Sequence, residues 1–176
     1  MEITAETAPH YFTLTEEAVC SFDTSTKINP PLRSKKDVEA IKEGLRDGTI
    51  DVIASDHAPH SSLEKDVEYD VAAFGIIGLE TLLPLTLRLV SQNVLSLTEA
   101  LKKLTINPAK ILGINKGRLC EGADADITIV DMDAEYTVDV ASFRSKSRNS
   151  PFHGWRLKGR VIYTLVSGTL VYKAQG

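Results

Sequence analysis

The sequence predicts an α/β portion over residues 1–114 followed by a small all-β portion over residues 115–176. The apolar run at 52–54 is typical of a strand covered on both faces. Segments with helical spacing surround that run, whereas polar and apolar residues alternate beyond about residue 115. The first portion offers about two strands, too few for a closed barrel. We therefore expect its strands to pair with segments outside this chain.

The elements before the apolar run follow from caps and prolines. A short strand is expected at 3–5, and a short helix at 15–19 with Thr15 as its cap. Residues 26–33 are predicted to be extended, because a proline disfavours the helical conformation in the residue before it. Ser34 is expected to cap a helix that closes near Gly48.

After the apolar run, residues 61–70 read as charged and irregular, and three helices follow. Residues 80–90 form a strongly apolar helix with Pro84 near its first turn, where proline is tolerated. Ser96 and Glu99 form a capping box at the start of the next helix. The third helix covers 107–113 and ends at a glycine.

The tail carries the alternation of half-buried strands. Three stretches show it, at 122–130, 136–138 and 161–172. Ser167 and Gly168 interrupt the last stretch with a hairpin turn. The sequence therefore predicts a small antiparallel sheet after the helices.

Composition limits the class of protein. The chain is 43% hydrophobic and 25% charged, which is typical of a folded globular protein. A net charge of -4 excludes a basic nucleic-acid footprint, and no apolar run reaches the roughly 18 residues of a membrane span. The amino terminus has no secretory pattern, and Cys20 and Cys120 lack metal-type spacing. We expect a cytoplasmic protein.

The apolar run leads directly into a cluster of titratable residues, Asp-His-Ala-Pro-His at 56–60. Asp56 is expected at the carboxyl end of the strand, which is the end that carries chemistry in barrels of alternating strands and helices. An aspartate after a strand is also a common turn former or helix cap. His57 and His60 are two of only four histidines, which favours a site.

Several motifs occur in one order along nearly the whole chain. They are Ala-Glu-Thr-Ala-Pro-His-Tyr-Phe (5–12), Asn-Pro-Pro-Leu-Arg (29–33), Ser-Asp-His-Ala-Pro-His (55–60), Phe-Gly-Ile-Ile-Gly-Leu-Glu (74–80), Gly-Arg-Leu (117–119), Gly-Ala-Asp-Ala-Asp (122–126) and Asn-Ser-Pro-Phe (149–152). Together they resemble the carboxyl-terminal portion of the dihydroorotases, in the amidohydrolase superfamily. Each motif is weak alone, and their shared order is the evidence.

The resemblance implies a fold and a reaction. The fold is α/β: the last units of a (β/α)8 TIM-type barrel, incomplete in this chain, followed by a small β domain that completes a composite sandwich. The reaction is the zinc-dependent interconversion of N-carbamoyl-L-aspartate and dihydroorotate in pyrimidine biosynthesis. Asp56 would bind Zn²⁺ and shuttle a proton between the attacking hydroxide and the departing amide nitrogen.

The same resemblance implies substrate-binding residues. Asn29 would recognise the pyrimidine ring, His60 the substrate carboxylate, and the backbone at Gly75 would approach the ring where a side chain would obstruct it. Asn29 is alternatively a residue held extended by the next proline, and Gly75 a turn glycine. His57 would support Asp56.

Other residues near these motifs have less specific roles. Glu6 and His10 would line the site. The alternative is a packing or turn role, which is at least as common for such residues. Arg33 is expected to be a structural ion-pair partner.

Metal ligands of the family are missing from this sequence. The resemblance implies a His-x-His pair, a bridging Lys or Asp and two further histidines, and this chain has no His-x-His. A zinc site takes three or four protein ligands. We therefore expect the chain to be inactive alone.

Two other interpretations remain open. One is a hydantoinase, dihydropyrimidinase or allantoinase, against which His60 argues because those relatives usually lack the second histidine of the motif. The other is a non-catalytic, dihydroorotase-like partner subunit. Expected partners are the small-molecule substrate and further copies of the chain, with aspartate transcarbamoylase as an alternative, and neither nucleic acid nor membrane.

Overall fold

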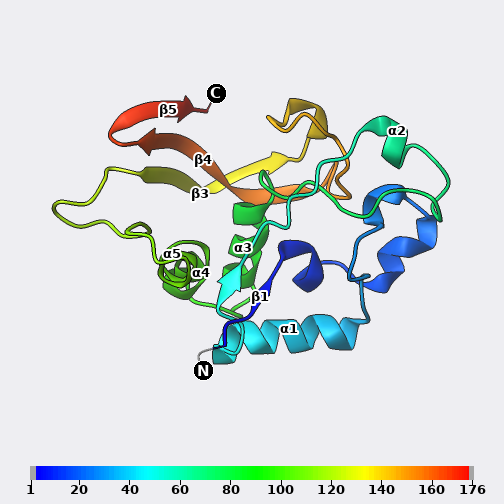
Figure 1. Ribbon diagram of the computed structural model, residues 1–176, viewed down its shortest axis with the longest axis horizontal. Helices are drawn as coiled ribbons and strands as arrows, with labels where there is room; N and C mark the ends of the chain where they lie inside the picture. Colours follow the sequence, from blue (N-terminus) through cyan, green and yellow to red (C-terminus); the bar gives the residue numbers. More distant parts are fainter. Residues whose placement is uncertain (1–2, 175–176) are drawn as a thin grey trace.

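The computed structural model describes residues 3–174, and its first portion contains a two-stranded parallel sheet (Figure 1). Strand β1 (Glu6–Thr7) pairs with β2 (Val52–Ile53), with Glu6 opposite Val52. The strand predicted at 52–54 is therefore confirmed, while the first strand lies just after the predicted 3–5. Among the described residues the sheet does not close into a barrel. The predicted fold class, an incomplete set of β/α units followed by a β domain, is confirmed.

Helices fill the rest of this portion. They are α1 (Lys35–Asp47), α2 (Ser62–Lys65), α3 (Leu82–Ser91), α4 (Leu97–Leu104) and α5 (Ile106–Ile111), with 3₁₀ helices η1 (Pro9–Phe12), η2 (Glu16–Ser21) and η3 (Thr24–Thr26). Ser34 caps α1 by accepting a bond from Asp37 N, and Gly48 ends it with φ 86°. Ser96 and Glu99 form the predicted capping box of α4.

One local prediction is confirmed in part and another is wrong. A short helix forms at 15–19 as predicted: it is the 3₁₀ helix η2 with Thr15 at its N-cap position, but the Thr15 side chain makes no capping bond. The segment predicted to be irregular contains α2, which begins with a capping box between Ser61 and Glu64. The serine and glutamate three residues apart carry the signal for this helix.

The second portion is a three-stranded antiparallel sheet. Its strands are β3 (Ile127–Thr137), β4 (Arg156–Val166) and β5 (Thr169–Lys173), in the order β3-β4-β5, with η4 (Val140–Ser142) after β3. The hairpin between β4 and β5 turns at Ser167 and Gly168, as predicted, and both have positive φ. The stretches at 122–130 and 136–138 contribute to a single strand, β3, whose pairing with β4 is irregular between Asp131 and Glu135. Figure 1 shows this sheet above α3, which packs against β4.

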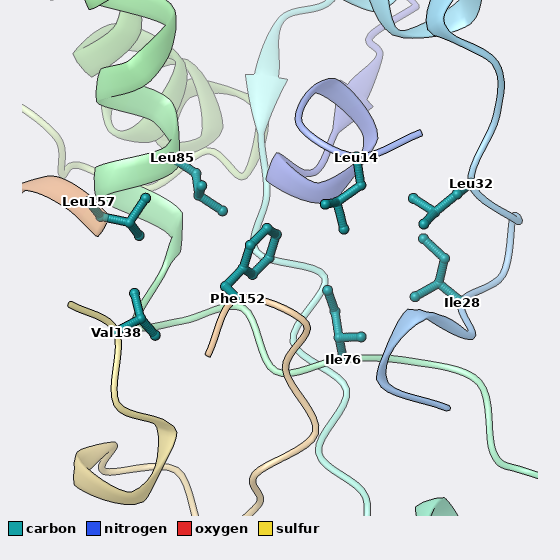
Figure 2. Close-up of a cluster of buried hydrophobic side chains, with 8 residues drawn as sticks. All are labelled: Leu14, Ile28, Leu32, Ile76, Leu85, Val138, Phe152 and Leu157. Atoms are coloured by element: carbon teal, nitrogen blue, oxygen red, sulfur yellow. The ribbon is translucent and has the colours of Figure 1, made fainter. Parts of the chain in front are cut away.

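A buried apolar cluster joins the two portions. Leu14, Ile76 and Leu85 come from the first, and Phe152 and Leu157 from the second. Figure 2 shows Phe152 at the centre of this cluster. A second cluster, which includes Leu45 and Leu89, packs α1 and α3 against β2. The site described next therefore rests on a core to which the β portion contributes directly.

Candidate functional site

Asp56 lies three residues beyond β2, at the carboxyl end of the parallel pair. Its backbone adopts φ 46°, which is uncommon for a non-glycine residue, and its side chain is 53% exposed. The carboxyl end of β1 lies beside it, because the two strands run parallel. The turn η1 follows β1 and carries His10, whose Nε2 is 3.4 Å from Asp56 Oδ2. The structure therefore brings the predicted carboxylate against a buried imidazole.

His10 is only 2% exposed. Burial lowers its pKa from 6.5 to about 4, although the Asp56 carboxylate acts in the opposite direction. Its Nε2 has no partner with hydrogen-bond geometry among the described residues. His10 is thus a neutral imidazole at pH 7, and it faces the acid. The position of His10 beside Asp56 is compatible with lining the site.

Tyr11 joins this edge to the loop that carries Asn29. Its ring lies 4.2 Å from that of His10, and its hydroxyl donates to Pro30 O at 3.0 Å. Burial, followed by the nearby Asp56 charge, raises the pKa of Tyr11 to about 12, so the phenol keeps its proton. Asn29 itself is exposed. Our sequence analysis did not single out Tyr11, because a tyrosine beside a histidine carries no specific signal.

The two histidines of the 56–60 motif have different surroundings. His60 Nε2 lies 2.8 Å from Phe74 O, and its Nδ1 is 3.5 Å from Glu64 Oε1. A carbonyl only accepts, so Nε2 carries the proton. His57 Nδ1 accepts bonds from Gly78 N at 3.1 Å and Leu79 N at 3.4 Å. Its ring therefore orders the backbone at 78–79, and the imidazole that approaches Asp56 is that of His10.

Gly75 passes close to the 56–60 motif. Its φ is 123°, and a Cβ at this position would lie 2.5 Å from Ala58 Cβ and 3.4 Å from His60 Nε2. A side chain at 75 would therefore push the two segments apart. Both interpretations of Gly75 require this backbone freedom.

The remaining predicted residues are exposed and lie outside the Asp56–His10 contact. Arg33 is exposed, with Nε 3.9 Å from Asp37 Oδ2 at the start of α1, which agrees with a structural ion pair. Glu6 lies in β1 and is exposed. A cleft of about 500 Å³ opens beside His60, where Lys65, Lys146 and Arg148 contribute to its walls.

The described residues do not form a zinc site by themselves. Among residues 3–174, no group of three or more His, Cys, Asp or Glu side chains is placed to hold a metal ion. Asp56 and His10 supply two donors, fewer than the three or four that a protein zinc site takes. We therefore derive no chemical step through a metal. The same residues include no helix long and apolar enough to cross a membrane.

Comparisons with known proteins identify relatives of this chain. The chain is 56% identical over 174 residues to a dihydroorotase of Geobacter sp. (strain M21), covering 99% of this chain and 41% of the relative. A dihydroorotase of Pelotomaculum thermopropionicum is 59% identical over 172 residues, 97% of this chain and 40% of the relative. This chain thus spans about two fifths of the length of these relatives.

Solved structures of hydantoinases resemble this chain in fold. An L-hydantoinase (dihydropyrimidinase) from Arthrobacter aurescens superposes with a TM-score of 0.91 at 35% identity, covering 97% of this chain and 39% of that one. A D-hydantoinase superposes with a TM-score of 0.88 at 27% identity, with the same coverage. The sequence model of the amidohydrolase family matches residues 10–171. The chain therefore belongs to the amidohydrolase family.

Proposed function

We propose that this chain contributes to a cyclic amide hydrolase that interconverts N-carbamoyl-L-aspartate and dihydroorotate, the dihydroorotase reaction of pyrimidine biosynthesis. The main observation behind this proposal is the position of Asp56 at the carboxyl end of the parallel strands, where its Oδ2 lies 3.4 Å from Nε2 of the buried His10. Relatives named dihydroorotase at 56–59% identity support the substrate.

Asp56 is the catalytic residue of this proposal. In hydrolysis, a water oxygen attacks the ring amide carbonyl carbon, and the carbon–nitrogen bond breaks. Asp56 accepts the proton that the water loses and delivers it to the departing nitrogen. Its exposure of 53% leaves the carboxylate open to a reactant, and the buried His10 Nε2 lies 3.4 Å from its Oδ2.

Substrate binding is assigned to Asn29, His60 and Gly75. The exposed Asn29 amide would donate to and accept from the ring. His60 would pair with the substrate carboxylate, for which its ring must leave Phe74 O or use Nδ1. The Gly75 backbone would lie against the ring, since no side chain stands there.

The proposal includes a cofactor, a location and partners. Zn²⁺ would be the cofactor, with Asp56 as one ligand and the other ligands outside this chain. We propose a cytoplasmic, homo-oligomeric protein, with aspartate transcarbamoylase as an alternative partner. Purified alone, the chain should show no turnover of dihydroorotate with added zinc.

Complementation tests the proposal. The chain is co-expressed with the part of the Pelotomaculum dihydroorotase that it does not cover, and hydrolysis of dihydroorotate and of hydantoin is measured. Turnover of dihydroorotate by the assembled complex supports the proposal. Turnover of hydantoin alone would assign the chain to the hydantoinases, which the superposition with the L-hydantoinase makes the second candidate. A folded complex without either activity would indicate a non-catalytic subunit.

A further inference from the structure

Asn149 reaches from the second portion of the chain into the candidate site. It lies between η4 and β4 and is 5% exposed. Its Nδ2 donates to Ala58 O at 2.9 Å and to Gly75 O at 3.0 Å. Its Oδ1 accepts from His60 N at 3.4 Å and from the Ser147 hydroxyl. One carboxamide thus contacts both segments that carry the predicted substrate-binding residues.

Other bonds also join those two segments: His60 Nε2 lies 2.8 Å from Phe74 O, and His57 Nδ1 accepts from Gly78 N and Leu79 N. An isolated parallel bridge pairs His57 with Ile76, and Ala58 N donates to Ile76 O at 2.8 Å. The Asn149 amide group adds two bonds beside this bridge, one to each segment. Because its two N–H donors have a fixed separation, they fix the spacing between the two carbonyls that accept from them.

The backbone around Asn149 is fixed by the apolar core. Phe152, three residues later, is 1% exposed at the centre of the cluster that joins the two portions (Figure 2). The Asn149 carbonyl also accepts from Ile77 N at 3.0 Å. The side chain therefore projects from backbone that is held at both ends, which a residue needs if it is to position others.

We infer that Asn149 is a positioning residue. It holds the segment 56–60, which carries His60, against Gly75, and it thereby sets how the carboxylate-bearing ring of the substrate fits between them. The identity of that ring rests on the proposed function. The positioning itself rests only on the contacts above. Through Asn149, the β portion of the chain takes part in substrate recognition without touching the substrate.

Asn149→Asp tests this inference in the full chain, because aspartate keeps the size and the Oδ acceptor but loses both donors. Amide hydrogen exchange is followed by NMR at Ala58 and Gly75, with Ala54 as the reference. Ala54 N donates to Thr7 O in the parallel pair, away from Asn149. We expect exchange at Ala58 and Gly75 to accelerate at least tenfold relative to Ala54. Equal acceleration at all three would show a merely structural role and overturn the inference.

Asn107→Asp is the matched control. Asn107 Nδ2 also donates to a distant carbonyl, Asp51 O, at 2.9 Å, but at the amino end of β2. This variant should leave the ratio of Ala58 to Ala54 exchange unchanged or lower it. If Asn149→Asp does not fold, Asn149→Ala serves for the same comparison, since it also removes both donors.

A second readout links the positioning to the substrate. In the complemented enzyme, Asn149→Asp should raise KM for dihydroorotate at least tenfold and change kcat less than threefold. An unchanged KM would contradict a role in substrate fit. If the wild-type complex is inactive, the proposed function fails, while the exchange experiment still decides whether Asn149 positions the two segments.

Discussion

Replacing Gly75 with alanine tests how closely the two segments of the site are packed. The new Cβ would lie 2.5 Å from Ala58 Cβ, and the residue would have to keep φ 123°. A non-glycine residue in such a sparsely populated region costs about 1–3 kcal/mol. Overpacking of this half-buried contact costs about 1–3 kcal/mol more. Gly75→Ala should therefore lower the free energy of unfolding by roughly 2–6 kcal/mol.

Gly48→Ala separates the two contributions. Gly48 also has positive φ, 86°, but a Cβ there would meet nothing within 4 Å. It should cost only the backbone penalty, about 1–2 kcal/mol. Urea unfolding followed by circular dichroism, with linear extrapolation, measures both values. The packing argument is refuted if Gly75→Ala costs no more than Gly48→Ala.

Three further predictions concern stability. Phe152→Ala should lower the free energy of unfolding by about 3–5 kcal/mol, because Phe152 fills the centre of the shared core; a loss below about 1 kcal/mol in urea titration would contradict that packing. Folding lowers the pKa of His10 from 6.5 to about 4, so the unfolded chain binds this proton more readily. The contribution of His10 to the free energy of unfolding should be fully present above pH 6.5 and should fall toward pH 4 by up to about 1.4 kcal/mol per pH unit. His10→Gln should flatten this part of the stability profile, and an unchanged slope would exclude His10 as its source. Ser34→Ala should cost about 0.5–2 kcal/mol by removing the α1 cap, and a thermal midpoint equal to that of the parent chain would show that this bond is unimportant.

The sequence predicted best those elements whose determinants are local. Ser34 with Gly48, and Ser96 with Glu99, mark helix ends within a few residues, and the structure has these ends. The Ser167 and Gly168 turn is equally local. The short helix predicted at 15–19 is present as a 3₁₀ helix, and a threonine before two glutamates suits either an α-helix or a 3₁₀ helix.

The site was predicted only in part, because its contacts span the chain. The approach of His10 to Asp56 joins residues from two strand ends and depends on the parallel pairing of β1 and β2. Asn149 contacts Ala58 across 91 positions. Neither contact has a local pattern. The resemblance located the motifs, but only the folded chain shows which side chains meet.

The most direct test of the account is Asp56→Asn in the complemented enzyme. An asparagine keeps the size and one acceptor oxygen but cannot take the proton of the attacking water. Asp51→Asn is the control, because Asp51 lies at the opposite end of β2, where its Oδ2 accepts from Ala5 N at 2.9 Å. We predict that Asp56→Asn abolishes dihydroorotate turnover in a fully assembled complex, while Asp51→Asn retains it. Equal turnover by the two variants would contradict the assignment of proton transfer to Asp56.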